Sequence, residues 1–348
     1  MLLLSILLIS SSLSRTAGSD SFIHLLLTNC ISVCLRLLFT EDTFRLAGGK
    51  DLSKERKISV AIPASIVTDV PHLREKTSKI GLIGRAAAIF KVDRIIIYPD
   101  NPHVNQATDI DLIATLLSYM ETPQYLRKKL FELRPELRYA GVLPPLRTPH
   151  HPLNRKMENL KIGEYREGVT VSKTKTGVLV DIGVEKPALI PNKLLPMGRR
   201  VTVKIVKVNK RVSAELVSSD EIPQYWGYKV ISERRSIGKI LKNKTFDLKI
   251  ATSKYGTPFK DVAGEIAEKW EKAKSILIAF GSPTKGLYEI VEREGLKLDE
   301  IVDFTVNTIP NQGTETVRTE EALIASLAVL NLHAAQGSGS QKCKEINV

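Results

Sequence analysis

The sequence is poor in cysteine, with Cys30, Cys34 and Cys343 as the three residues of this type in 348. Positions 35–342 therefore contain none, and no C-x-x-C pair occurs. Both a disulfide framework and a structural zinc site need paired cysteines, so this scarcity argues against either. Cys30 and Cys34 are spaced to meet on one helix, but two sulfurs alone make a poor metal site. We expect no metal ion.

Two common phosphate-binding signatures are also missing. The glycine-containing segment Gly281–Gly286 follows an apolar run, yet it has neither G-x-G-x-x-G nor the ending G-K-[ST]. The sequence therefore supports neither a Rossmann dinucleotide site nor a P-loop.

Acidic residues are fewer than basic ones, at 38 Asp and Glu against 51 Lys and Arg, so the net charge is +13. An excess of this size favours a polyanionic partner, because Lys and Arg neutralise phosphates and release counterions. A basic protein without such a partner is the alternative. The length suggests two domains at roughly 100–200 residues each.

Long apolar runs are confined to the N-terminal end, at Leu2–Leu8 and at Phe22–Phe39, where His24 and Arg36 interrupt the second run. A signal peptide needs a basic region before its apolar core, and a membrane span tolerates charge poorly. Three interpretations of residues 1–55 stay open: a mis-assigned start, a weak membrane or signal segment, and a helical extension. We favour the first, and expect a cytoplasmic protein with no membrane association.

Strand and helix patterns alternate on both sides of a central segment. The expected strands are Ile58–Ile62, Arg94–Tyr98, Phe246–Ala251, Ser275–Phe280 and Ile301–Val306. The expected helices are Leu73–Lys91, Asp109–Met120, Pro123–Leu133, Val262–Ala273, Thr284–Glu294 and Thr319–Leu332. This alternation predicts an α/β domain with a parallel sheet, built from residues 56–150 and 221–333. The proline-rich stretch Leu143–Leu153 is a predicted linker, and residues 334–348 are a predicted disordered tail.

The central segment, residues 155–220, has a different pattern. Short strands are expected at Val169–Val171, Gly177–Ile182, Val201–Val208 and Arg211–Val217, which predicts a small antiparallel β-barrel of the OB type. The segment has 14 basic and 7 acidic residues, so it contributes +7. The candidate nucleic-acid-binding residues are Lys173, Lys175, Arg199, Arg200, Lys204, Lys207, Lys210 and Arg211. The alternative is a barrel that only braces a dimer or packs on the main domain.

Three polar loops are expected after strands of the second α/β half, at Thr252–Gly256, Gly281–Gly286 and Asn307–Thr314. In parallel sheets, ligands bind beyond the carboxyl ends of strands. Each loop alone could be an ordinary turn. The loop from Asn307 lies between a buried strand and a helix that Thr319 can cap, so it could hold an adenosine through backbone groups.

The segment DFTVNTIPNQGTETVRTEEALIASLAVLNL resembles the knotted C-terminus of SPOUT (α/β-knot) RNA methyltransferases. Four further segments, KISVAIPASIV, IGRAAAIFKVDRIIIYPD, ATSKYG and ILIAFGSP, occur in the order of the archaeal and eukaryotic subfamily with an OB-type insertion. The resemblance covers Lys57–Leu332. It implies a trefoil knot, which is rare among folds, together with S-adenosylmethionine as cofactor and a homodimer through the knot region.

The resemblance also implies site residues. The cofactor-binding positions would be Lys254, Gly281, Asn307, Thr308, Ile309, Pro310, Gln312, Gly313 and Thr316. Arg85 matches an arginine that contacts RNA and assists catalysis, and its fork of donors suits a phosphate. The other interpretation is a surface arginine near a helix end. Glu320 is a candidate base, although a first-turn glutamate often only caps its helix.

The predicted function is an S-adenosylmethionine-dependent RNA methyltransferase acting on ribosomal RNA, with a uridine base as the target. The absence of a suitably placed cysteine disfavours a covalent Cys-dependent methylation. A non-catalytic RNA-binding or ribosome-assembly protein with the same fold is the alternative.

Overall fold

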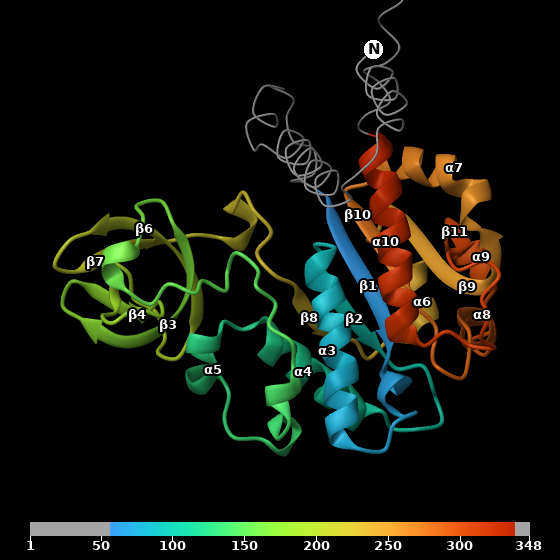
Figure 1. Ribbon diagram of the computed structural model, residues 1–348, viewed down its shortest axis with the longest axis horizontal. Helices are drawn as coiled ribbons and strands as arrows, with labels where there is room; N and C mark the ends of the chain where they lie inside the picture. The colour runs from blue at the N-terminus through green and yellow to red at the C-terminus, as the bar shows by residue number, and fades with distance from the viewer. Residues whose placement is uncertain (1–55, 338–348) are drawn as a thin grey trace, which may run out of the picture. The chain divides into compact units, whose positions relative to one another are not determined.

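The computed structural model describes residues 56–337 (Figure 1). The interpretations of residues 1–55 lie outside the described residues, as does the predicted tail beyond residue 337. The last helix, α10 (Thr319–Gly337), is longer than expected. The first four residues of the predicted tail, 334–337, are therefore helical rather than disordered.

A six-stranded parallel sheet forms the centre of the α/β part, in the order β11-β9-β10-β1-β2-β8. Its strands are β1 (Lys57–Pro63), β2 (Arg94–Tyr98), β8 (Lys229–Ser232), β9 (Leu248–Pro258), β10 (Ser275–Ala279) and β11 (Phe304–Asn307). The central strand β1 pairs Val60 with Ile278 of β10 on one side and with Ile95 of β2 on the other. The central strands β1, β2 and β10 are apolar and buried on both faces, as is typical of parallel sheets.

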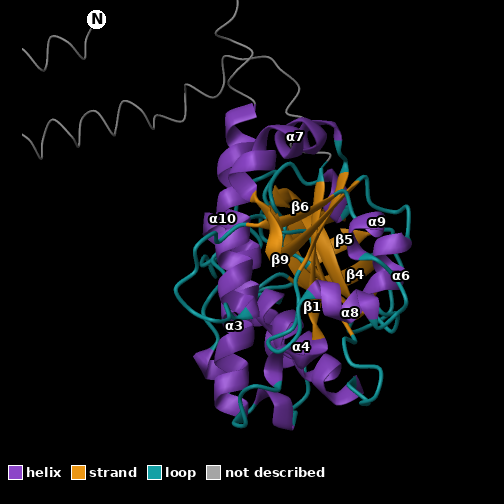
Figure 2. Cartoon of the chain, turned by 90° about the vertical axis from the view of Figure 1, so that its right-hand side faces the viewer, coloured by secondary structure: helices purple, strands orange, loops and turns teal. Residues whose placement is uncertain are grey.

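Two helical layers cover the sheet, as Figure 2 shows. One layer contains α3 (Leu73–Ile89), α4 (Ala107–Glu121), α7 (Phe259–Lys272) and α10, and it packs on Val60, Ile95 and Ile278. The other contains α6 (Ile237–Lys242), α8 (Leu287–Glu292) and α9 (Leu298–Ile301), and it packs on Ala61 and Leu277. Successive side chains of a strand point to opposite faces, which is why neighbouring residues join different cores.

Several predicted elements differ from the structure. The first residue of the expected strand Ile301–Val306 is the last residue of the short helix α9, and the strand itself, β11, begins at Phe304. The edge strand β8 and the short helix α6 escaped prediction because each has few residues in which to show a periodicity. Helix α5 (Gln124–Leu130) is shorter than the predicted Pro123–Leu133. Residues Thr252–Gly256, predicted as a loop, continue β9 instead.

The inserted segment folds as a closed barrel in the order β3-β4-β5-β7-β6. Its strands are β3 (Tyr165–Thr174), β4 (Gly177–Asp181), β5 (Ala188–Pro191), β6 (Arg200–Val208) and β7 (Val212–Leu216). Alternate residues such as Val178, Val180, Val203 and Ile205 fill its interior. Sequence patterns missed β5, whose pairing with β7 is parallel. The barrel is therefore mixed rather than purely antiparallel, while the predicted class of a parallel-sheet domain with an inserted barrel is confirmed.

A buried ion-pair network joins the barrel to helix α4. Arg200 of β6 donates from Nη1 to Glu121 Oε2 at 2.6 Å and from Nε to Glu167 Oε2 at 2.7 Å. His150 of the linker lies 3.2 Å from Glu121 Oε1. Burial raises the pKa of Glu121, but hydrogen bonds from His150 and Arg200 outweigh it and lower this pKa to about 2. The carboxylate thus stays charged and holds both partners.

Within residues 56–337, no helix is long and apolar enough to cross a membrane.

Candidate functional site

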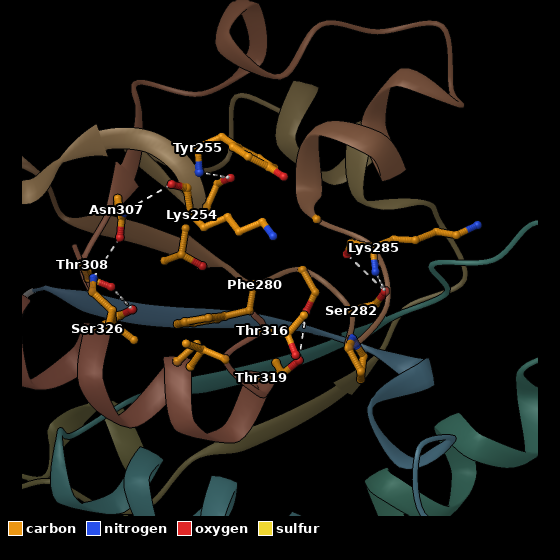
Figure 3. A pocket seen from close by; sticks show the side chains of 18 of the residues that line it. Lys254, Tyr255, Phe280, Ser282, Lys285, Asn307, Thr308, Thr316, Thr319 and Ser326 are labelled. Atoms are coloured by element: carbon orange, nitrogen blue, oxygen red, sulfur yellow. Dashed lines mark hydrogen bonds between the residues drawn. The ribbon is translucent and has the colours of Figure 1, made fainter. Parts of the chain in front are cut away.

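A pocket of about 260 Å³ lies where the carboxyl ends of β9, β10 and β11 meet the start of α10 (Figure 3). Its lining residues are Thr252–Tyr255, Phe280–Gly286, Glu289, Val306–Ile309, Gln312, Thr316, Val317, Thr319, Ala322 and Ser326. This position matches the rule that ligands bind beyond the carboxyl ends of parallel strands.

The turn after β10 forms one wall of the pocket. A Cβ on Gly281 would lie 3.1 Å from both Leu287 N and Lys285 O, so the backbone closes around this position. Ser282 N donates to Lys285 O at 2.9 Å, and Lys285 N donates to Ser282 Oγ at 3.0 Å. These reciprocal bonds hold a compact turn with no large side chain at its start.

Tyr98 supports this wall from the neighbouring core. Its hydroxyl donates to Phe280 O at 2.6 Å, just before Gly281. Burial raises the pKa of Tyr98 well above its usual range, so the hydroxyl remains a donor. Tyr98 therefore fixes the end of β10 where the pocket begins.

The polar loop after β11 forms the opposite wall. Asn307 accepts from Ile309 N at 3.0 Å through Oδ1 and donates to Lys254 O at 3.0 Å through Nδ2. Gln312 Nε2 donates to Thr314 O at 2.9 Å and to Glu315 O at 3.1 Å. Side-chain amides thus shape this loop and tie it to β9, and the partly exposed Ile309 faces the pocket.

Helix α10 supplies the floor through Thr319, Ala322 and Ser326, which share one face of the helix at i, i+3 and i+7. Thr319 Oγ1 donates to Gly281 O at 3.0 Å, and the hydroxyls of Ser326 and Thr308 lie 2.7 Å apart. The helix therefore binds both walls of the pocket.

The structure brings together seven of the nine residues expected to bind the cofactor. These are Lys254, Gly281, Asn307, Thr308, Ile309, Gln312 and Thr316. Pro310 and Gly313 lie in the same loop, but they are not among the lining residues. Tyr255, Ser282 and Lys285 were not named individually, although they lie in loops expected near a ligand, and sequence reasoning missed Thr319 and Ser326 as lining residues. For Thr319 and Ser326, the available signal was the helical spacing of small and polar residues on an otherwise apolar helix.

Arg85 lies on α3 and does not line this pocket. Its Nη1 donates to Pro145 O at 3.1 Å and also to Leu146 O. The guanidinium therefore holds the linker against the helix. Its predicted catalytic role stays a prediction.

Glu320 is buried and also lies outside the pocket lining. Its Oε2 is 3.4 Å from Nζ of Lys79, which donates to Asp69 Oδ2 at 2.6 Å. A carboxylate that faces a buried lysine fixes the start of α10 rather than reaching a substrate.

Most of the predicted basic residues of the barrel are exposed. Lys173, Lys175, Arg199, Lys207, Lys210 and Arg211 reach solvent. Lys204 is half-buried, 3.9 Å from Glu215. Arg200 is committed to Glu121 and Glu167, so we assign it to the barrel junction and no longer to the nucleic-acid surface.

Among residues 56–337, no group of three or more His, Cys, Asp or Glu side chains is arranged to hold a metal ion.

Comparisons with known proteins agree with this architecture. Residues 57–330 match a SPOUT-type family described as "Putative RNA methyltransferase". The chain is 35% identical over 290 residues to an uncharacterized protein of Halobacterium salinarum, with 79% of this chain and 98% of that protein covered. It is 34% identical over 305 residues to the 28S rRNA (uridine-N(3))-methyltransferase of Mus musculus, covering 78% and 75% of the two chains. The corresponding enzyme of Homo sapiens is 32% identical over 322 residues, covering 83% and 82%. With this match across both α/β segments and the barrel between them, the chain belongs to the SPOUT-type family of RNA methyltransferases.

Proposed function

We propose that this protein transfers a methyl group from S-adenosylmethionine to N3 of a uridine in ribosomal RNA. The observation that carries the proposal is the pocket at the ends of β9, β10 and β11, built from the residues that the SPOUT resemblance selects. The names of the murine and human relatives supply the nucleotide and the RNA class.

The chemistry of the lining suits S-adenosylmethionine. Ile309, Val317 and Ala322 offer apolar surface for a purine ring, while hydroxyls and backbone groups of both walls offer neutral hydrogen-bond partners. Lys285 supplies positive charge for a carboxylate. A Cβ at Gly281 would press on the backbone of Lys285 and Leu287, so this turn keeps its shape at the pocket only while the position lacks a side chain.

When bound, this cofactor would supply a methyl carbon already activated by a sulfonium. The protein's main contribution is then alignment, because holding two reactants in line removes most of the entropic cost. Glu289 is the one carboxylate side chain among the described lining residues, and its Oε1 accepts from Arg293 Nη2 at 2.8 Å. Glu289 is therefore a poor base. Lys254 instead lowers the pKa of the uracil N3–H by stabilising its anion, and the N3 proton leaves to solvent before N3 takes the methyl carbon.

The barrel serves as the RNA-binding part. Its strand order places a loop with Lys175 between β3 and β4 and a loop with Lys210 and Arg211 between β6 and β7. In an OB-type barrel these two connections commonly flank the oligonucleotide. Their exposed charges can neutralise phosphates and so position the RNA without reading its sequence.

The protein acts as a homodimer through the face formed by α3 and α10. These helices pack together, and the exposed surface of the pair includes Leu82 and Ile89 of α3 and Ile324 and Leu332 of α10. Exposed apolar patches of this kind commonly mark protein interfaces.

Calorimetric titration with S-adenosylmethionine tests the cofactor, and we expect one site per chain. Incubation with ribosomal RNA fragments, nuclease digestion and mass spectrometry then test for 3-methyluridine. If a folded dimer does not bind the cofactor, the enzymatic proposal fails. If it binds the cofactor and RNA but transfers nothing, the non-catalytic assembly role is favoured instead.

A further inference from the structure

Tyr255 lies on an excursion of β9 beside the pocket. The ladder between β9 and β11 pairs Ala251 with Thr305, and the next pair is Thr257 with Val306. Residues 252–256 are therefore extra on the β9 side, and they form a bulge at the edge of the pocket. Bulges of this kind re-aim side chains next to functional sites.

The backbone of this bulge is fixed on both sides of Tyr255. Thr252 Oγ1 donates to Ala279 O at 3.0 Å, and Asn307 Nδ2 donates to Lys254 O at 3.0 Å. After Tyr255, Gly256 approaches β11 so closely that a Cβ would lie 2.8 Å from Thr305 O. The position of Tyr255 is thus determined by contacts with β10 and β11.

The ring of Tyr255 has no comparable restraint. It lines the pocket, yet 74% of the residue is exposed. Within the part of the chain that the structure describes, its hydroxyl makes no hydrogen bond. Figure 3 shows the ring and the Lys254 side chain extending in the same direction, toward the turn with Ser282 and Lys285. Lys254 Nζ lies 5.1 Å from the ring centroid.

This combination of a fixed backbone and a free ring argues against a packing role. A core tyrosine would be buried, and a bulge that needed only its backbone shape would not require an aromatic side chain. The apolar lining for an adenine ring comes instead from Ile309, Val317 and Ala322. Tyr255 is left facing the mouth through which a substrate must enter.

We propose that Tyr255 is the stacking platform for the acceptor base, so that a uracil turned out of the RNA lies against its ring. This inference rests on the function proposed above. An enzyme that modifies a base edge must take the base out of its stack, and an aromatic face replaces part of the lost stacking. Lys254, with Nζ 5.1 Å from the ring centroid, then supplies positive charge beside the stacked uracil.

The test compares Tyr255→Phe with Tyr255→Ala in the full-length protein, using a ribosomal RNA fragment that the wild type methylates. Stacking on an aromatic side chain contributes about 1–3 kcal/mol, which corresponds to roughly 5- to 150-fold. We expect Tyr255→Ala to lose kcat/KM within this range, while Tyr255→Phe keeps most of it. The Kd for S-adenosylmethionine and the dimeric state should match the wild type in both variants.

A second readout separates stacking from a structural role. The same fragment is prepared with 5,6-dihydrouridine, whose puckered ring stacks poorly, in place of the target uridine. Wild type and Tyr255→Phe should bind the uridine RNA more tightly than the dihydrouridine RNA, and Tyr255→Ala should bind the two equally.

Preserved discrimination in Tyr255→Ala would overturn the proposal. Weaker cofactor binding in that variant would place Tyr255 in the cofactor site, and dissociation into monomers would place it at the dimer interface; either result also overturns it. If the wild type methylates no ribosomal RNA, the proposed function itself is wrong, and the role of Tyr255 then has no basis.

Discussion

The hydroxyl of Thr319 donates a hydrogen bond to the carbonyl of Gly281 at 3.0 Å, and so ties the start of α10 to the turn after β10. Both residues line the pocket, and both are fixed from behind. Gly281 follows Phe280, whose carbonyl accepts from Tyr98, and Thr319 precedes Glu320, which faces buried Lys79. Contacts within the protein, independent of any bound cofactor, therefore hold the shape of the pocket.

Substituting Thr319 tests this dependence. In Thr319→Val the carbonyl of Gly281 loses its hydrogen-bond donor. If the pocket then binds the cofactor less well by the value of one hydrogen bond, about 1 kcal/mol, the affinity for S-adenosylmethionine falls roughly fivefold. We expect calorimetry to show this loss in S-adenosylmethionine binding. Thr319→Ser keeps the hydroxyl and should bind as the wild type does. Equal affinity of all three proteins would show that the tie is irrelevant to the pocket.

Gly281→Ala should weaken cofactor binding by on the order of tenfold, corresponding to about 1.4 kcal/mol. Its methyl group would press on backbone atoms of Lys285 and Leu287 at 3.1 Å, and a backbone turn cannot yield as a flexible side chain does. The matched control is Gly264→Ala on α7, where a Cβ meets nothing within 4 Å. There we expect unchanged binding and a stability gain of about 0.5–1 kcal/mol. Unimpaired binding by Gly281→Ala would contradict the assignment of this turn to the cofactor.

Acidification should destabilise the protein through Glu121. Its pKa in the folded protein is about 2 against a usual 4.5, so the folded state resists protonation that the unfolded state accepts. This contribution is complete above pH 4.5 and is lost as the pH falls from there through about 2. At its maximum, this contribution to the free energy of unfolding is on the order of 3 kcal/mol.

Urea denaturation at pH 7 to pH 3 measures this effect. Glu121→Gln should be less stable at pH 7, because Arg200 loses one of its two carboxylate partners, and its stability should vary less with pH below 4.5. Glu268→Gln, which breaks an exposed pair with Lys272, is the control and should follow the wild-type curve. Parallel pH curves for Glu121→Gln and the wild type would rule out Glu121 as the titrating group.

The two basic barrel loops should determine the salt dependence of RNA binding. Replacing Lys175 and Lys210 together by Ala should lower the slope of log K against log salt by about 0.7 for each phosphate that the protein no longer neutralises. Cofactor affinity should not change. The double variant Lys260→Ala with Lys272→Ala removes the same charge from exposed positions of α7 and should keep the slope. An unchanged slope in the barrel variant would locate the RNA elsewhere.

Local sequence patterns predicted most of the α/β elements because long apolar strands and helices express their own periodicity. Strands β1, β2 and β10 were expected within one or two residues of their observed bounds. The short elements β5, β8 and α6 were missed, since four to six residues carry little pattern and depend on neighbours for their conformation. Seven lining residues were expected because the resemblance covers the loops that contribute them.

By itself, the sequence determined the fold class, the family and the loops that form the pocket, because these follow from the order of local segments. Tertiary structure alone decided which basic and polar side chains are free to act. In the sequence Arg200 looks like any other basic residue of the barrel, but in the structure it is paired with Glu121, 79 positions earlier in the chain. Tyr255 looks like part of a loop until the pairing of β9 with β11 leaves residues 252–256 out of the ladder and the Tyr255 ring exposed at the pocket. Both outcomes depend on contacts between residues distant in sequence, which local propensity does not encode.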